Sequence, residues 1–197
     1  MNRFQDDDDA WNLCNENDLW IFDKLILSRK LKYKCGPIGS YVPMPNWYIV
    51  RPCVNTEGLG RGATIEWIDY KSEHLSTGYF WCELFKGRHI SVDYTDQSQG
   101  LTVEGFRLLG DPIYKFCRWK KIKDVMPFPD IFKDLPYKYI NIEYIDNKII
   151  EIHLRHNPEF LDADNELIPI WSKDQKCPDG FKFRKNKDFK RIGFFYR

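Results

Sequence analysis

The residues best suited to chemistry lie in two regions that are distant in the sequence. Arg51 stands in an apolar run directly before a glycine-rich segment, and Glu143, Glu151 and His153 stand on two later segments of strand-like pattern. An arginine in an apolar strand needs an anionic partner, because burying it unpaired is costly. Glycine-rich turns bind phosphate, and carboxylates bind the divalent cations that accompany phosphates. Together these features predict a nucleotide site, although Arg51 alone fits a structural ion pair equally well.

The glycine-rich segment spans residues 57–63 and has three glycines in five positions. Glycine lets the backbone approach a phosphate closely and leaves the amides free to donate hydrogen bonds. The segment lacks the Gly-Lys-Ser/Thr ending of a P-loop, and the strands expected on both sides exclude the dinucleotide-binding fingerprint. An ordinary hairpin tip is the alternative interpretation. The residues predicted to contact phosphate are Glu57, Gly58, Gly60, Arg61 and Gly62.

The acidic pair of strands predicts a divalent cation. Glu151 and His153 are two positions apart, so both lie on one face of a strand, and Glu143 on the preceding strand can face them. Magnesium that is shared with nucleotide phosphates usually needs one or two protein carboxylates. Without the metal the carboxylates repel each other, so Glu151→Gln is expected to leave the stability of the apo protein nearly unchanged. The alternative is a solvated hairpin face.

Two further positions complete the predicted site. Arg155 continues the face of His153, and its guanidinium could hold a carboxylate or an acyl-phosphate oxygen, or pair with Glu143 or Glu159. An apolar strand ends near Glu83 and Leu84, where the backbone could offer donors and acceptors to a purine. Taken alone, this strand is equally typical of a core.

The elements that must position these residues are mostly strands. Apolar and β-branched runs bounded by turn residues predict strands, and Asp146-Asn147 predicts a tight turn. A helical period with Asn17 or Asp18 as N-cap and Gly36-Pro37 as its end predicts one early helix, and a short helix is expected within 127–136. The expected strands are 47–54, 63–70, 79–85, 89–94, 139–145 and 148–153, which gives a mainly β core in α+β order.

Composition limits the environment and the partners of the protein. The chain has 197 residues, of which 43% are hydrophobic, so it can bury one sizeable core. Its net charge of +1 gives no general attraction to nucleic acid or to acidic membranes. No stretch approaches the roughly 20 apolar residues of a membrane span, and six scattered cysteines form no Cys-x-x-Cys pair. We therefore expect a cytoplasmic protein with reduced thiols and no membrane association.

The two ends of the chain differ in charge. Residues 1–17 include four consecutive aspartates and are expected to form an acidic flexible arm without chemistry. The expected domain covers residues 18–165, and residues 166–197 are expected to pack on it as a basic, aromatic C-terminal segment. Cations alternating with aromatic residues in 173–197 are also typical of single-stranded nucleic-acid binding, but we favour a terminal strand pair with solvated cations.

Four of these stretches, in their order along the chain, resemble the motifs of the ATP-grasp superfamily. They are Ile49-Val50-Arg51-Pro52, the 57–63 loop, residues 82–93 and Glu151-Ile152-His153-Leu154-Arg155, and the resemblance covers about residues 19–160. It implies two α+β lobes with antiparallel sheets that clasp ATP with Mg²⁺. It also implies an ATP-dependent ligase that joins a carboxylate to an amine or similar nucleophile through an acyl phosphate.

The resemblance implies a role for each predicted residue. Arg51 would bind the α and β phosphates in place of the usual lysine, and the 57–63 loop would close over the β and γ phosphates. Glu83 and Leu84 would lie at the adenine. The implied metal ligands are Glu143, Glu151 and His153, and the implied catalytic residues are Arg61 and Arg155, of which Arg155 orients the acyl phosphate.

Some departures from the family pattern bear on function. Arg51 replaces Lys, His153 replaces the usual Asn ligand, and His89 stands where many members have a ribose-binding Glu. Because about fifty residues precede Arg51, the separate N-terminal domain that helps form the acceptor site in most members is expected to be reduced or absent. The basic C-terminal segment, a homo-oligomer or a partner protein would then complete that site. The alternatives are a catalytically reduced nucleotide-binding protein of this fold and a nucleic-acid-binding protein.

Overall fold

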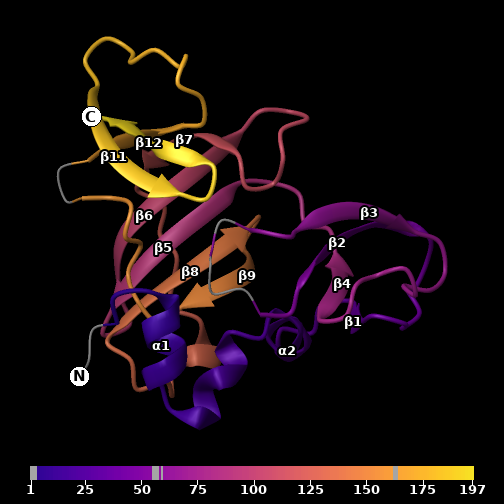
Figure 1. Ribbon diagram of the computed structural model, residues 1–197. Coiled ribbons are helices and arrows are strands. Elements are labelled where there is room, and N and C mark those ends of the chain that lie inside the picture. The colour runs from indigo at the N-terminus through magenta and orange to yellow at the C-terminus, as the bar shows by residue number, and fades with distance from the viewer. Residues whose placement is uncertain (1–3, 55–57, 59, 162–163) are drawn as a thin grey trace.

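The computed structural model describes residues 4–54, 58, 60–161 and 164–197. The described chain forms two antiparallel sheets that lie side by side as separate lobes (Figure 1). The small lobe has the strand order β1-β4-β2-β3, and the large lobe has the order β11-β12-β10-β7-β6-β5-β8-β9. The predicted α+β class with two antiparallel lobes is confirmed.

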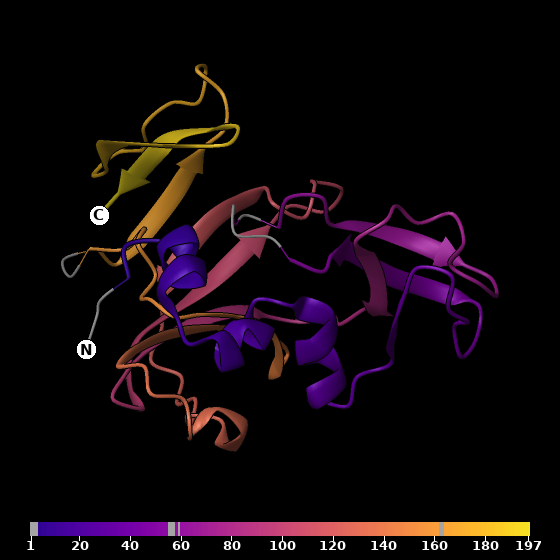
Figure 2. The same ribbon diagram turned by 60° about the horizontal axis from the view of Figure 1, so that its bottom comes forward.

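The small lobe places the glycine-rich loop at the end of a hairpin. Strands β2 and β3 pair from Asn46 with Ile68 to Val50 with Thr64, so the loop follows at the end that faces the large lobe (Figure 2). The predicted pairing of the two strands is therefore confirmed, and residues 55–57 and 59 of the expected tip lie outside the described residues. The strands of this lobe are β1 (Cys35–Pro37), β2 (Asn46–Pro52), β3 (Thr64–Ile68) and β4 (Tyr79–Glu83).

The large lobe carries the predicted acidic hairpin at one edge of its sheet. Asp146 and Asn147 both have positive φ, 48° and 63°, as a tight turn between twisted strands requires. Strands β6, β7 and β10 were not expected from the sequence. The strands are β5 (His89–Thr95), β6 (Ser98–Arg107), β7 (Phe116–Lys121), β8 (Tyr139–Ile145), β9 (Lys148–His153), β10 (Glu166–Ile170), β11 (Lys182–Asp188) and β12 (Arg191–Tyr196).

The N-terminal segment is not the solvated arm that its aspartates predict. Residues 7–13 form helix α1 (Asp7–Leu13), whose N-cap is Asp6 with its side chain accepting from the Asp9 N–H at 2.8 Å. Phe4 and Ala10 are buried in the core of the large lobe, and Asp7 is buried as well. Carboxylates in the first turn favour a helix through its dipole, and the two apolar residues anchor it. The prediction is wrong for these described residues.

The single early helix of the prediction is two helices. The 3₁₀ helix η1 (Glu16–Ile21) has Phe22 as its C-cap. Helix α2 (Lys24–Lys30) begins after it with Asp23 as N-cap, whose side chain accepts from the Ile26 N–H at 2.9 Å. The cap residue Asp23 interrupts the apolar period that the sequence shows. Helix α2 contacts β4 of the small lobe and β9 of the large lobe. The short helix predicted within 127–136 is present as η2 (Asp130–Phe132).

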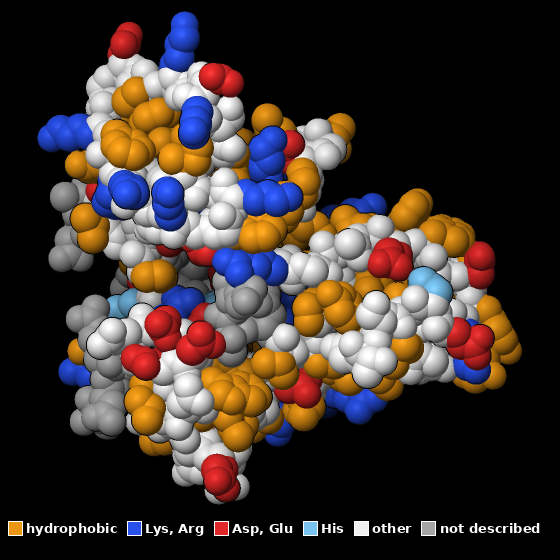
Figure 3. Space-filling model, in the orientation of Figure 1, with side chains coloured by type: hydrophobic (Ala, Val, Ile, Leu, Met, Phe, Trp, Pro, Cys, Tyr) orange, Lys and Arg blue, Asp and Glu red, His pale blue; other side chains and the backbone are white. Residues whose placement is uncertain are grey.

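The C-terminal segment extends the large sheet. Strand β12 pairs with β10 and with β11, and Phe194 and Phe195 of β12 are buried on opposite faces of the sheet. Its arginines form ion pairs with the domain, such as Arg184 with Asp164 at 2.8 Å and Arg197 with Glu166 at 2.6 Å. The favoured terminal strand pair is therefore confirmed, but its cations are not all solvated, because Arg191 is buried in an ion pair with Glu159. Lysines and arginines surround an apolar patch on this lobe in the space-filling view (Figure 3).

None of the helices in the described residues is long and apolar enough to cross a lipid bilayer.

Candidate functional site

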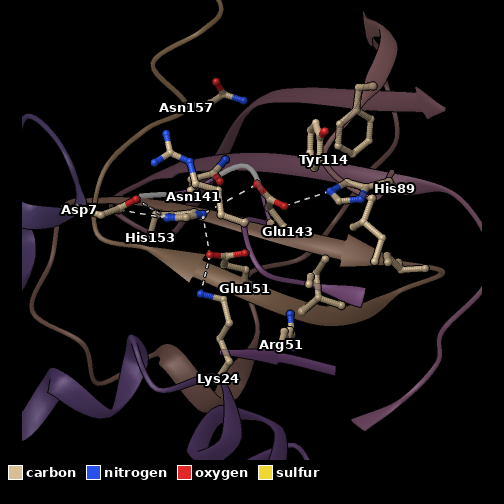
Figure 4. A pocket seen from close by; sticks show the side chains of 18 of the residues that line it. Asp7, Lys24, Arg51, His89, Tyr114, Asn141, Glu143, Glu151, His153 and Asn157 are labelled. Atoms are coloured by element: carbon tan, nitrogen blue, oxygen red, sulfur yellow. Dashed lines mark hydrogen bonds and ion pairs between the residues drawn. The ribbon is translucent and has the colours of Figure 1, made fainter. Parts of the chain in front are cut away.

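A cavity of about 390 Å³ lies between the two lobes and is lined from both of them. In the small lobe, the inner face of β2 and β3 and the glycine-rich turn line this cavity. From the large lobe it receives the adjacent ends of β5, β8 and β9, and the N-terminal segment closes one end (Figure 4). Of the predicted site residues, it brings together Arg51, Gly58, Gly60, Arg61, Leu84, Glu143, Glu151, His153 and Arg155.

Arg51 presents an unsatisfied cation to the cleft. It lies on β2 with its guanidinium 5.4 Å from the centre of the Phe80 ring, and its Nε is buried with no hydrogen-bond partner. The structure gives it no ion pair within the described residues. A buried guanidinium donor without an acceptor is costly, so this position favours an anionic ligand.

The glycine-rich turn approaches the cleft with Gly58, Gly60 and Arg61. Gly62 has φ +75° and does not line the cavity; an added Cβ would lie 2.7 Å from Tyr79 Oη, so glycine is required there for packing. Glu57 lies outside the described residues. Arg61 Nη2 contacts Asp188 Oδ1 at 2.7 Å and the guanidinium stacks 4.9 Å from the Phe189 ring, which ties this turn to the C-terminal hairpin.

At the predicted purine end, the two residues of the pair differ. Leu84 lines the cavity beside Phe85. Glu83 does not line it, because its carboxylate accepts the Lys34 N–H at 3.0 Å and its own N–H donates to the Lys34 carbonyl at 2.8 Å. Glu83 thus joins β4 to the segment after α2, and its role at an adenine stays a prediction.

The acidic floor of the cleft is formed by Glu143 and Glu151, which are directly opposite each other on β8 and β9. Each already has a nitrogen-bearing side chain of the protein beside it. Glu143 Oε2 lies 3.0 Å from His89 Nε2, and Glu151 Oε1 lies 2.8 Å from Lys24 Nζ. Although burial raises the pKa of Glu143, hydrogen bonds and charges from His153 and His89 hold it well below its usual range. Glu143 is therefore a carboxylate at neutral pH.

His153 lies between three carboxylates (Figure 4). Its Nδ1 is 3.0 Å from Asp7 Oδ2, and its Nε2 is 3.8 Å from Glu143 Oε1 and 3.9 Å from Glu151 Oε1. Burial alone lowers the pKa of this imidazole, but the charge and hydrogen bond of Asp7, with the hydrogen bond of Glu143, raise it to about 9. The imidazole is thus protonated at neutral pH in this arrangement.

The fit of a magnesium ion to these residues depends on the two glutamates. Within the described residues no three or more His, Cys, Asp or Glu side chains are arranged to hold a metal by themselves. Magnesium bound with nucleotide phosphates does not need such a cage, and the oxygens of Glu143 and Glu151 are donors of the right kind. Protonated His153 has no lone pair to offer, so as a ligand it stays a prediction that requires loss of its proton.

Arg155 forms the far end of the cleft together with the N-terminal segment. Its Nη2 lies 2.6 Å from Asp7 Oδ2, its Nη1 donates to the His156 carbonyl at 3.1 Å, and its Nε is buried with no partner. Burial raises the pKa of Asp7, but His153 and Arg155 together lower it to about 2. Asp7 is therefore ionised across the physiological range.

Two contributors to this site were missed in the sequence. Asp7 belongs to an acidic run in which no local pattern distinguishes the residue that becomes buried. Lys24 follows the N-cap Asp23 and looks like an ordinary polar helix position, yet it is 6% exposed. One signal was present: a lysine directly after an N-cap aspartate lies at the start of a helix, where its charge is unfavourable unless an acidic partner is near.

No family model and no curated protein matches the chain. Among solved structures, N5-carboxyaminoimidazole synthetase from Staphylococcus aureus, complexed with ADP, aligns with a TM-score of 0.56 at 12% identity, covering 92% of this chain and 68% of that one. A protein from Archaeoglobus fulgidus assigned provisionally to the ATP-grasp superfamily aligns with a TM-score of 0.51 at 12% identity, covering 90% of this chain and 64% of that one. The chain has the ATP-grasp fold.

This ATP-grasp fold spans about two thirds of the length of the solved structures that it matches. Identities of 12% establish the architecture and leave activity to be argued from the site. In this chain, the four stretches that carried the resemblance all contribute residues to one cleft, namely Arg51, then Gly58, Gly60 and Arg61, then Leu84, and the end of β9 with Arg155.

Proposed function

We propose that this chain is an ATP-dependent ligase that joins a carboxylate to an amine or similar nucleophile through an acyl phosphate. The observation that supports it best is the convergence, in one cleft of an ATP-grasp fold, of an arginine whose buried Nε has no hydrogen-bond partner, a glycine turn and two opposed glutamates. These are the groups that a triphosphate and its counter-ion require. The S. aureus synthetase, complexed with ADP, supports the choice of an adenine nucleotide.

In this proposal the nucleotide lies between the lobes. Arg51 binds the α and β phosphates, and the glycine-rich turn with Arg61 covers the β and γ phosphates, where backbone amides and a guanidinium both stabilise developing charge. Leu84 packs against the adenine. Glu143 and Glu151 would hold a magnesium ion, which supplies neutralisation of the phosphate charge when it is bound.

The proposed reaction has two steps. A carboxylate oxygen of the first substrate attacks the γ-phosphorus; a new O–P bond forms, the bond to the bridging oxygen breaks, and ADP leaves. The nucleophile then attacks the acyl carbon and inorganic phosphate leaves, while an amine gives up its proton to water. Arg155 lies at the end of the cleft opposite the purine and stabilises the oxyanions of the acyl phosphate.

Thermal unfolding with a non-hydrolysable ATP analogue tests the nucleotide site, because a ligand that binds the native state raises its stability by mass action. We expect a rise in melting temperature that is larger with magnesium. No shift at millimolar ATP would overturn the proposal. Turnover is tested next by incubating protein, MgATP and a panel of carboxylates with hydroxylamine, which converts an acyl phosphate to a coloured hydroxamate; acyl-phosphate formation requires that product.

A nucleotide-binding protein without turnover is the second candidate. The observation that favours it is that both glutamates already have partners within the chain, Lys24 at Glu151 and His89 at Glu143. The ammonium of Lys24 balances charge that a catalytic metal would otherwise balance. Stabilisation by nucleotide without release of phosphate or formation of hydroxamate selects this candidate.

A further inference from the structure

A carboxylate of the protein itself occupies the acceptor end of the cleft. Asp7 stands in the first turn of α1 with its side chain 4% exposed, and its Oδ2 accepts from Arg155 at 2.6 Å and from His153 at 3.0 Å. All three residues line the cavity, and Figure 4 shows Asp7 pointing at the imidazole of His153. Two donors at the end of β9 thus converge on one oxyanion that comes from a distant part of the chain.

The contact of Asp7 with Arg155 and His153 resembles the binding of an anionic ligand more than an ordinary ion pair. Arg155 Nη2 donates to Asp7 Oδ2, and His153 Nδ1 lies 3.0 Å and 3.1 Å from Oδ2 and Oδ1, so two nitrogen donors hold the carboxylate as they would hold the carboxylate or phosphoryl group of a ligand. The Arg155 Nε remains buried without a partner, so Asp7 does not saturate the guanidinium. The cavity continues past this point along Asn157 and Glu159, so an oxyanion entering the cleft reaches the same donors.

We propose that Arg155 and His153 form an oxyanion-binding site whose occupant in this structure is the chain's own Asp7, and that α1 is a built-in competitor of the ligand. The ligand class is a carboxylate or a phosphoryl group. Only the identity of that ligand rests on the proposed ligase function, under which it is the acceptor carboxylate or its acyl phosphate. Binding of the ligand requires α1 to withdraw Asp7 from the site.

The N-terminal segment is suited to such a displacement. Helix α1 has seven residues, and an isolated helix of that length is marginal in water, so its position depends on its contacts. Those contacts are the Asp7 pairs, a small apolar anchor at Phe4 and Ala10, and an edge contact of the Trp11 ring with the Phe22 ring, whose centroids are 5.5 Å apart. Elements held by few buried contacts open with less free energy than the core of a domain.

Inorganic phosphate is the probe that tests the proposal. Its affinity is measured by calorimetry in EDTA, without nucleotide, for the wild type, Asp7→Asn and the exposed neighbour Asp8→Asn as matched control. Removing the competing charge within a few ångströms of the site is expected to tighten phosphate binding at least about tenfold in Asp7→Asn and not in the control. Equal or weaker phosphate binding by Asp7→Asn would overturn the proposal and make Asp7 a structural anchor.

A second measurement uses the wild type and therefore does not depend on the folding of the variant. Saturating phosphate should speed hydrogen exchange of the α1 amides while leaving those of β12 unchanged. Unchanged exchange in α1 would overturn displacement. Failure of the ligase function is seen separately, as absence of stabilisation by the ATP analogue, because the phosphate titration contains no nucleotide.

Discussion

The ammonium of Lys24 lies 2.8 Å from Glu151 Oε1, and the two side chains are 7% and 13% exposed. From the sequence, Glu151 is expected to be one of two carboxylates that repel each other in the absence of a metal ion. In the structure the charge of Glu151 is instead compensated by a lysine at the start of α2. The stability of the apo protein therefore depends on Glu151, which changes the expected result of the simplest mutation at this position.

Glu151→Gln should destabilise the metal-free protein by about 2–4 kcal/mol, because it removes the negative charge beside a buried ammonium. Urea unfolding in EDTA measures this change. Glu73→Gln is the matched control, since Glu73 pairs with Lys71 on the surface, and it should change stability little. If Glu151→Gln destabilises the protein no more than the control does, Glu151 does not stabilise the apo protein and is better interpreted as a metal ligand.

Arg51→Ala should weaken binding of the ATP analogue by about 1.5–3 kcal/mol, the range of hydrogen bonds to charged groups. Its effect on the unliganded protein should be small, because Arg51 has no ion pair within the described residues and its Nε has no partner. Calorimetry measures the affinity, and Arg29→Ala, an exposed arginine of α2, is the control. Unchanged affinity in Arg51→Ala would remove Arg51 from the site.

Elements of this fold that depend on residues close together in the sequence were predictable, and elements that depend on distant residues were not. The strand at 47–54, the acidic hairpin and its Asp146-Asn147 turn were predictable because alternation and turn chemistry are local. Strand β6 was not, since Gly100 and Gly105 weaken its pattern; Gly105 is required because a Cβ there would lie 2.7 Å from the Phe116 ring. That requirement comes from β7 and is invisible within β6.

The predictability of the site residues depended on sequence separation in the same way. The opposition of Glu143 and Glu151 follows from two strands and one short turn, so spacing sufficed to predict it. Lys24, the partner of Glu151, and Asp7, the partner of His153, come from more than a hundred positions away, and their local sequence does not identify these partners. Whether the predicted residues bind ATP and magnesium stays a prediction for the experiments above.

The Asp7–His153 pair predicts a window of pH in which the protein is most stable. His153 has a pKa of about 9 against its ordinary 6.5, so its contribution is complete below about pH 6.5 and is lost as pH rises through 9. Asp7 has a pKa of about 2 against 3.8, so its contribution is complete above about pH 3.8 and is lost as pH falls through 2. The pair should contribute most between about pH 4 and 6.5.

The difference in unfolding free energy between the wild type and Asp7→Asn, measured in EDTA across this range, tests the window. It should reach at most about 3 kcal/mol in the window and decline on both sides, since the two pKa shifts describe one pair and do not add. A difference that is independent of pH would show that Asp7 stabilises the fold by packing and not by its charge.

The Arg61–Asp188 contact joins the glycine-rich turn of the small lobe to the C-terminal hairpin across the cleft, with side chains 24% and 34% exposed. A pair this exposed contributes less than about 1 kcal/mol to stability. Asp188 Oδ2 also lies 3.7 Å from Nη2 of the buried Arg191, which keeps its closer contact with Glu159, so Asp188→Asn should leave the fold intact. If the contact holds the turn over a bound nucleotide, dissociation of a fluorescent ATP analogue in a stopped-flow experiment should become roughly three- to fivefold faster, an amount that corresponds to the energy of such a pair. Phe189→Ala should act in the same direction by removing the stacked ring, whereas Asp179→Asn, at an exposed position of the same segment, should not. Unchanged dissociation in both Asp188→Asn and Phe189→Ala would mean that the hairpin supports the large lobe without controlling access to the cleft.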